Sequence, residues 1–235
     1  MSKDKLMLRA ADLSAVELFS GLTSDALDAV LAKSAVCHFA RGELALLQGT
    51  RSGELHVVVS GAFKASSLTE GGSAVTLAIM GRNEVFGEMA FLDGGTHSAN
   101  VAALIGSRTL RISASVLESL AEQHPRLRAY LAKVLTARLR RLSTASERMA
   151  VDDVTARLAR QLLELSERFG APDAGGTRIM LELPQQELAE LVGATRERVN
   201  RVLAAWMKCG WVSRRGRQVV LLSRPQLSRH AGLGG

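Results

Sequence analysis

Between residues 11 and 34, apolar side chains recur at steps of three and four, the spacing typical of amphipathic helices. Gly21 interrupts the pattern after the first run. Thr23 or Ser24 then stands where a second helix would need its N-cap. We therefore expect short helices over this stretch.

The pattern changes between residues 36 and 112. Short apolar runs, such as 56–60 and 74–79, have a β-rich composition. Turns that contain glycine separate the runs, and they fall at 41–42, 60–61, 70–72 and 81–83. Short strands divided by such turns predict a compact antiparallel barrel or sandwich.

Helical spacing returns after residue 113. One helix is expected over about 115–123, and Pro125 suits the first turn of a second, much longer helix. Steps of four and three along the longer helix define a mostly apolar stripe: Leu131, Leu135, Leu139, Leu142, Ser146 and Met149. The stripe predicts a coiled-coil seam between two copies of the chain. The alternative is an amphipathic helix packed on its own domain.

Beyond this long helix, Asp153 is expected to begin another helix that runs to about Phe169. Residues 170–177, GAPDAGGT, are rich in turn-forming residues and are expected to form a loop. The loop would separate a last, small unit from the rest of the chain.

In that last unit, the stretch 183–206 predicts two helices joined by a tight turn. Ala189 is small where two helices would cross, and Gly193 suits the left-handed backbone of the turn. Thr195 is a good N-cap for the second helix. Together these features are typical of a helix-turn-helix.

The second helix has two chemically distinct faces. Its apolar face is made of Val199, Val202, Leu203 and Trp206. The opposite face carries Arg196, Glu197, Asn200 and Arg201. Arginine pairs with guanine, glutamate accepts from cytosine and asparagine pairs with adenine, so this face matches base edges in the major groove.

The segment after the second helix, WVSRRGRQVVLL, consists of two apolar runs around a central glycine. This pattern predicts a β-hairpin. Arg214, Arg215 and Arg217 would place positive charge over DNA phosphates, as in the wing of a winged helix.

Charge is divided unevenly along the chain, whose net charge is +7. Residues 1–125 carry 10 Lys and Arg against 13 Asp and Glu, whereas residues 126–235 carry 20 against 10. We therefore expect a polyanion to meet the second half. No apolar run approaches the roughly 18 residues of a membrane span, and no secretion signal is visible, so a cytoplasmic location is expected.

Several kinds of chemistry are not expected. The chain has no nucleophile elbow, no HExxH motif, no P-loop and no paired acids in a plausible cleft, so it is not expected to be an enzyme. Cys37 and Cys209 form no CxxC pair, which argues against a zinc or iron–sulfur site. The five histidines show no spacing typical of a haem axial pair, so neither metal nor haem is expected.

The order of these parts, with GEMAFLDGG in the first and TRERVNR in the last, resembles the bacterial cyclic-AMP receptor protein and fumarate–nitrate regulator (CRP/FNR) family. The likeness extends from about Val16 to Leu222. It implies an α+β fold with an N-terminal β-roll, a long dimerisation helix and a C-terminal winged helix-turn-helix. The implied domains are residues 1–124, 125–152 and 153–235.

The resemblance implies a homodimeric, sequence-specific transcription regulator that is controlled by a small effector. Its DNA site would be a palindrome with half-sites resembling TGTGA, and RNA polymerase would be its protein partner. The stretch that begins at Asp153 resembles the family's hinge. The expected DNA-binding residues are Thr195, Arg196, Glu197, Asn200, Arg201, Arg214 and Arg217.

The resemblance also implies an effector pocket. In it, Glu88 would accept a hydrogen bond from a ribose hydroxyl, and Ser98 would bond a phosphate. The expected pocket residues of the β-roll are Gly87, Glu88, Met89, Ala90, His97, Ser98 and Ala99. Those expected from the long helix are Arg138, Arg141, Ser143 and Thr144.

Two positions depart from the cyclic-AMP-binding members. His97 stands where they have a phosphate-clamping arginine, and a neutral imidazole lacks the charge and the fork of a guanidinium. Leu142 stands where they usually have a threonine that reaches the adenine.

These departures leave three interpretations of the pocket. It binds another nucleotide, preferentially cyclic di-GMP, with Arg138, Arg140 or Arg141 supplying the missing charge. Alternatively it binds cyclic AMP weakly, or it is empty and the regulator is independent of an effector. A different class, a cyclic-nucleotide-regulated enzyme or channel subunit, would share the β-roll but not the helix-turn-helix.

Overall fold

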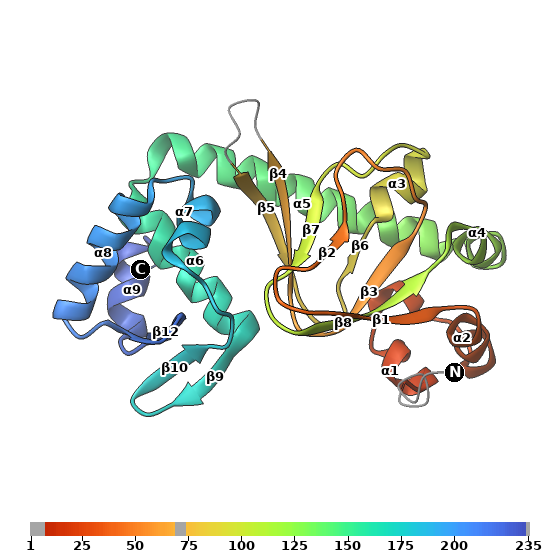
Figure 1. Ribbon diagram of the computed structural model, residues 1–235, viewed down its shortest axis with the longest axis horizontal. Helices are drawn as coiled ribbons and strands as arrows, with labels where there is room; N and C mark the ends of the chain where they lie inside the picture. The colour runs from red at the N-terminus through yellow and green to blue at the C-terminus, as the bar shows by residue number, and fades with distance from the viewer. Residues whose placement is uncertain (1–7, 69–73, 234–235) are drawn as a thin grey trace. The chain divides into compact units, whose positions relative to one another are not determined.

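The computed structural model describes residues 8–68 and 74–233 (Figure 1). The chain divides into two compact units. The first unit comprises Met1–Ser67 and Ala78–Arg140, and the second comprises Leu68–Leu77 and Arg141–Gly235. The turn expected at residues 70–72 lies outside the described ranges.

Short helices begin the first unit, as the apolar spacing predicts. They are α1 (Ala10–Ser14), the 3₁₀ helix η2 (Glu17–Phe19) and α2 (Ser24–Ala32). The Thr23 hydroxyl accepts a hydrogen bond from the Ala26 amide at 3.3 Å, so Thr23 is the N-cap of α2. Their buried side chains face the β-rich part of the unit.

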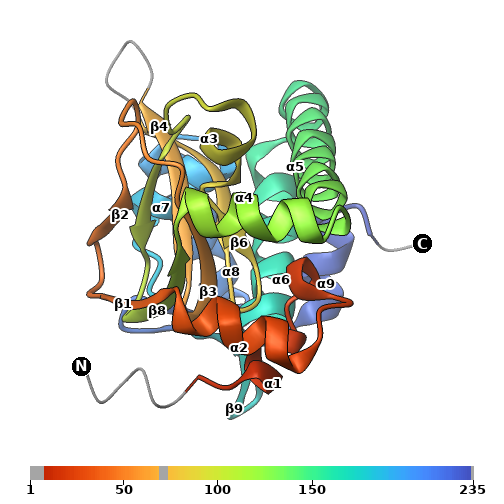
Figure 2. The ribbon, with the colours of Figure 1, turned by 90° about the vertical axis from the view of Figure 1, so that its right-hand side faces the viewer.

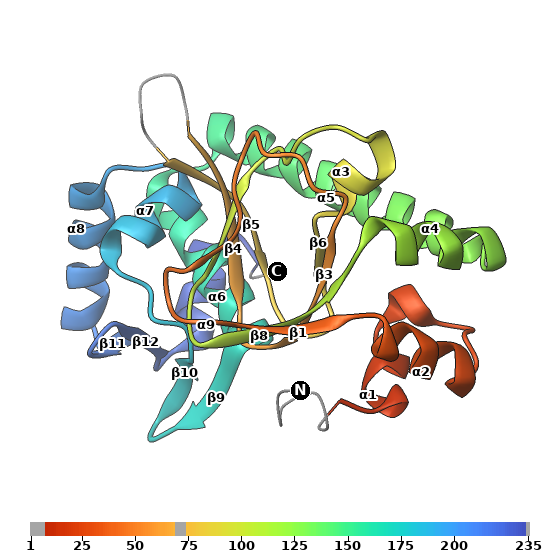
Figure 3. The ribbon, with the colours of Figure 1, turned by 45° about the vertical axis from the view of Figure 1, so that its right-hand side comes forward.

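Two antiparallel four-stranded sheets form a β-roll (Figure 3). The first sheet has the order β1 (Ala35–Phe39), β8 (Ser107–Ile112), β3 (Leu55–Ser60), β6 (Val85–Phe86). The second has the order β2 (Leu44–Leu46), β7 (Asn100–Ala103), β4 (Phe63–Leu68), β5 (Ala74–Met80). The predicted antiparallel sandwich is therefore confirmed.

The first unit has two apolar cores. One lies between the sheets and includes Phe63, Phe86 and Val101. The other lies between the first sheet and the helices, including α4 (Ala114–Gln123) and the start of α5 (Arg126–Val151), which flank the roll in Figure 2. Leu131 is fully buried in this second core. The seam prediction was therefore wrong for Leu131, because burial against its own unit removes that side chain from any interface.

The second unit combines helices with a small sheet. After the end of α5, which belongs to this unit from Arg141 on, its helices are α6 (Val154–Phe169), α7 (Gln185–Val192), α8 (Arg196–Lys208) and α9 (Arg224–His230). Its antiparallel sheet has the order β11 (Val212–Arg215), β12 (Gln218–Leu221), β10 (Gly176–Ile179), β9 (Gly170–Asp173). Asp153 caps α6 by accepting from the Ala156 amide at 2.7 Å. The predicted winged helix-turn-helix is confirmed, and α9 is an element that the apolar spacing did not indicate.

The loop expected over residues 170–177 is instead part of a β-hairpin. Strands β9 and β10 pair along their length, and β10 continues the sheet by pairing with β12. A Cβ at Gly176 would overlap the carbonyl oxygen of Leu221. A glycine is therefore needed where the backbone of β10 approaches that of β12 closely. The prediction failed because glycine and proline read as loop formers locally, whereas the neighbouring strand supplies the pairing.

A buried histidine lies in the core of the β-roll. The His56 ring stacks on Phe86 with centroids 4.9 Å apart, and its Nδ1 lies 2.9 Å from the Thr109 hydroxyl. The other ring nitrogen, Nε2, has no hydrogen-bond partner. Burial, reinforced by Arg111 and His97, lowers the pKa of His56 to about 4.

This pKa predicts that the protein loses stability in mild acid. As pH falls below 6.5, His56 becomes protonated in the unfolded state. In the folded state the same ring stays neutral until the pH reaches about 4. The free energy of unfolding should therefore drop by about 3 kcal/mol over this window, measured by urea unfolding at several pH values.

The control is His56→Phe, which cannot titrate and retains a ring against Phe86. The gap in stability between the variant and the unaltered chain should shift in the variant's favour as pH falls from 6.5 to 4. A gap that does not change with pH would show that His56 does not cause the acid sensitivity.

Candidate functional site

The turn between α7 and α8 is held by local backbone geometry and by one arginine. Gly193 has φ of +59°, the left-handed conformation predicted for it. Ala189 is buried at the helix crossing. From α6, Arg157 donates hydrogen bonds to the carbonyl oxygens of Val192 at 2.8 Å and Gly193 at 3.3 Å. The turn is therefore anchored to α6 within the second unit.

Helix α8 is capped and buried as the pattern predicts. The Thr195 hydroxyl accepts from the Arg198 amide at 3.4 Å. Val199, Leu203 and Trp206 are buried, and Val202 is half-buried. This packing fixes which face of α8 is turned to solvent.

The solvent face of α8 carries every residue expected to read DNA bases. Arg196, Glu197, Asn200 and Arg201 are all exposed. The Asn200 side-chain oxygen accepts a hydrogen bond from the Gln185 amide nitrogen at 2.7 Å, which couples α7 to this face. Arg198 is also exposed, although the sequence pattern did not indicate it as a DNA-binding residue.

Hydrogen bonds to the Glu197 carboxylate favour its charged form, which can only accept hydrogen bonds. Its own backbone N–H and the Thr195 hydroxyl donate to the carboxylate, and these bonds lower its pKa. The carboxylate is therefore ionised at neutral pH, the state that accepts a hydrogen bond from a cytosine amino group.

The wing arginines differ in their surroundings. Strands β11 and β12 pair from Val212 to Leu221, and Arg217 lies exposed in the turn between them. Arg214 instead donates to the carbonyl oxygens of Leu183 at 3.1 Å and Arg217 at 3.3 Å. Arg214 thus braces the wing, and burial lowers its pKa. Exposed Arg215 pairs with Asp173 of β9 at 3.0 Å.

In the first unit, the stretch expected to hold an effector forms a short helix, α3 (Glu88–Asp93), between two left-handed glycines. Gly87 precedes it with φ of +90°, and a Cβ there would overlap the carbonyl oxygen of Glu54. The backbone at Gly87 therefore runs tightly against the segment that leads into β3. Ala90 is buried, whereas Met89 is exposed.

Glu88 is only 1% exposed and forms an ion pair with Arg138 of α5. Arg138 also donates to the carbonyl oxygen of Val85. Of the two Glu88 carboxylate oxygens, Oε1 accepts from Arg138 and Oε2 has no partner. An unpaired buried carboxylate oxygen is costly, so Oε2 is an acceptor that a ligand hydroxyl would satisfy.

His97 lies inside the protein. It is 5% exposed, and its Nε2 lies 2.8 Å from the Ser52 hydroxyl. Burial lowers its pKa, with a smaller opposing effect from Glu54, so the ring is neutral at pH 7. His97 therefore offers no positive charge to a ligand, and its Nε2 is already bonded to Ser52.

The remaining residues expected in the pocket are divided between the units. Ser98 is exposed, with its hydroxyl 3.3 Å from the Met89 sulfur, and Ala99 is buried. Arg141, Ser143 and Thr144 belong to the part of α5 in the second unit; the first two are exposed and Thr144 is half-buried. The structure therefore brings together the β-roll residues and Arg138.

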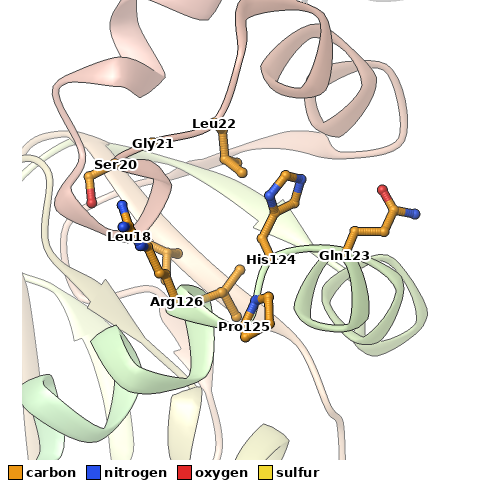
Figure 4. Close-up of a pocket in the computed structure, with 9 residues that line it drawn as sticks. Leu18, Ser20, Gly21, Leu22, Gln123, His124, Pro125 and Arg126 are labelled. Carbon is orange, nitrogen blue, oxygen red and sulfur yellow. The ribbon is translucent and has the colours of Figure 1, made fainter.

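A hollow of about 270 Å³ lies elsewhere in the first unit, between the N-terminal helices and the turn from α4 to α5 (Figure 4). The Arg126 side chain reaches toward Ser20 and Gly21 across it (Figure 4). None of the residues expected to bind effector or DNA lines this hollow.

Among the described residues, no group of three or more His, Cys, Asp or Glu side chains is arranged to hold a metal ion. Over the same ranges, no helix combines the length and apolar content that a bilayer crossing requires. Cys37 and Cys209 are free thiols.

Family models match both units of the chain. Residues 36–124 match the cyclic nucleotide-binding domain, and residues 156–230 match the Crp-like helix-turn-helix domain. These two matches coincide with the β-roll and with the winged helix-turn-helix.

Whole proteins of similar sequence are transcription regulators. The CRP-like cAMP-activated global transcriptional regulator of Mycobacterium tuberculosis is 31% identical over 97% of this chain and 99% of its own length. The cyclic AMP receptor protein of Thermus thermophilus is 30% identical over 83% of this chain and 87% of its own.

Solved structures agree with this likeness. The c-di-GMP responsive global regulator CLP of Xanthomonas campestris has a TM-score of 0.72 and 27% identity, covering 86% of this chain and all of its own. The relatives are regulators rather than enzymes. The chain therefore belongs to the CRP/FNR family of transcription regulators, with a cyclic nucleotide-binding domain and a DNA-binding helix-turn-helix domain.

Proposed function

We propose that this protein is a homodimeric regulator that reads a palindromic DNA site through the solvent face of α8. The observation that carries the proposal is the exposure of Arg196, Glu197, Asn200 and Arg201 on one face, opposite a buried stripe. The half-sites would resemble TGTGA, and RNA polymerase would be the protein partner. Exposed Arg217 supplies a phosphate contact from the wing.

Arg196→Ala tests this assignment. Loss of one bidentate contact to guanine should cost about 1–3 kcal/mol and relax base preference at one position in each half-site. The measurement is binding to a palindromic duplex with TGTGA half-sites and to duplexes that carry single base changes, at fixed salt.

Lys208→Ala is the matched control, because Lys208 is exposed at the other end of α8. This variant should leave the relative affinities for the different duplexes unchanged. If Arg196→Ala also preserves those ratios, Arg196 does not read a base.

Dimerisation is proposed to use the exposed leucines of α5. Leu139 is 65% exposed and Leu142 is 45% exposed, although each carries an apolar side chain at seam spacing. Ser146 is exposed and Leu135 half-buried, whereas the side chain of Met149 lies outside the described part of the chain. The proposed domains are an effector-sensing domain at residues 1–124, a dimerisation helix at 125–152 and a DNA-binding domain at 153–235.

The effector is proposed to be cyclic AMP. The preference for cyclic di-GMP relied on Arg138, Arg140 or Arg141 to supply the missing charge, and of these Arg138 is paired with Glu88 whereas Arg140 and Arg141 are exposed. Two similar regulators are named for cyclic AMP, one of them matched over 97% of this chain. Cyclic di-GMP is the second candidate, because a regulator of similar structure is described as responsive to it.

Calorimetric titration with cyclic AMP and, in a matched run, with cyclic di-GMP tests this choice. Heat from cyclic AMP alone would support the proposal, and heat from cyclic di-GMP alone would replace it with the second candidate. Heat from neither would identify a regulator that works without these effectors.

Control of DNA binding is proposed to be a population shift. An effector held between the β-roll and α5 would favour one arrangement of the hinge near Asp153, and so one spacing of the two recognition helices. Within the second unit, Arg157 bonds both the Asp152 carbonyl oxygen at 2.6 Å and the turn before α8. Movement of the hinge would thus reach the recognition helix through a direct contact.

A further inference from the structure

The proposed nucleotide site lacks its expected cation. A cyclic nucleotide carries a negative phosphate, and His97, at the clamp position, is buried and neutral with its Nε2 bonded to Ser52. Arg138 is paired with Glu88, and Arg111 lies 3.4 Å from Glu54. A charge for the phosphate must therefore come from another residue.

The connection between β2 and β3 is hydrogen-bonded to residues 97–100, the segment that would face the phosphate. The Gly49 amide donates to the His97 carbonyl oxygen at 2.9 Å, and the His97 amide donates to the Thr50 carbonyl oxygen at 2.9 Å. The Gln48 amide donates to the Asn100 side-chain oxygen at 2.9 Å. Residues 48–52 thus lie directly beside residues 97–100, and Figure 3 shows this connection near the end of the roll that carries α3.

Arg51 is the cation within residues 48–52, the part of the connection that lies beside residues 97–100. Its neighbours on either side, Thr50 and Ser52, both contact His97. Arg51 is exposed, and in the part of the chain that the structure describes it makes no hydrogen bond or ion pair. A guanidinium is always charged and binds two phosphate oxygens through its fork of donors.

We propose that Arg51 binds the phosphate of the nucleotide, and that the Ser52–His97 hydrogen bond positions the segment that carries it. The proposal rests on the proposed function of the pocket as a nucleotide site. A second observation points independently to a ligand there: Glu88 Oε2 is a buried acceptor without a partner. Arg51 and Glu88 would then meet the phosphate and the ribose of the same ligand.

The test measures binding of cyclic AMP and of adenosine to the full-length chain by calorimetry. Arg51→Ala should weaken cyclic AMP binding about ten- to a hundredfold, the loss expected for a charged hydrogen bond. Adenosine has no phosphate, so its affinity should not change. Arg51→Lys keeps the charge without the fork and should give an intermediate loss for cyclic AMP.

Arg128→Ala is the control for net charge. Arg128 is exposed in α5, and ten helical residues, about 15 Å, separate it from Arg138. It should bind cyclic AMP as the unaltered chain does. Thermal unfolding of each variant should match the unaltered chain, because Arg51 and Arg128 are both exposed.

Each contrary outcome has a separate meaning. Equal cyclic AMP binding by Arg51→Ala and the unaltered chain overturns the role of Arg51 and leaves the nucleotide site standing. An equal loss for cyclic AMP and adenosine shows that Arg51 shapes the loop rather than binding phosphate, and overturns the proposal. No binding of cyclic AMP by the unaltered chain overturns both the proposed effector and the inference.

Discussion

Replacing Arg138 with leucine is expected to destabilise the first unit by about 3–5 kcal/mol. The change removes the partner of Glu88, which is 1% exposed, and leaves a carboxylate buried without compensation. It also frees the carbonyl oxygen of Val85. Urea unfolding measures the loss, and hydrogen exchange of the amides in β6 and α3 assigns it to this unit.

Two further variants make this prediction specific. Arg140→Leu removes an exposed arginine from the same helix and should change stability by less than about 0.5 kcal/mol. In the double variant Glu88→Leu with Arg138→Leu, no charge is left buried, so much of the loss should be recovered. A loss below about 1 kcal/mol for Arg138→Leu alone would show that water or another group solvates Glu88.

Trp206→Ala is expected to cost the second unit about 3–5 kcal/mol and to abolish DNA binding. Trp206 is 2% exposed and forms part of the buried stripe of α8, and its ring lies 6.0 Å from that of His230 in α9. Truncation leaves a cavity between these two helices. Chemical unfolding and retention on a palindromic duplex measure the two effects.

Met207→Ala is the control for this prediction, because the next residue along α8 is exposed and its truncation opens no cavity. It should retain DNA binding and lose less than about 1 kcal/mol of stability. Full DNA binding by Trp206→Ala would show that α8 keeps its position without this anchor.

The family and its two functional regions were predictable from the sequence, but the state of the pocket was not. The helix-turn-helix rests on spacing and caps that lie within a few residues, as at Gly193 and Thr195. The buried His97 ring is hydrogen-bonded to Ser52, which lies 45 residues earlier in the chain. No local pattern brings that pair together, because their contact follows from how the strands of the roll are ordered.

Local sequence was enough to predict α6, α7 and α8, the N-caps of α2, α6 and α8, and the solvent face of α8, because each depends on side chains one or two turns apart. It did not indicate α3 or α9. Three other features became visible only in the fold: Leu131 belongs to a core, residues 170–173 pair with 176–179 as strands, and Arg138 forms an ion pair with Glu88. These outcomes join segments distant in the sequence. Their energies come from burial and pairing, which exist only once the fold has brought the partners together.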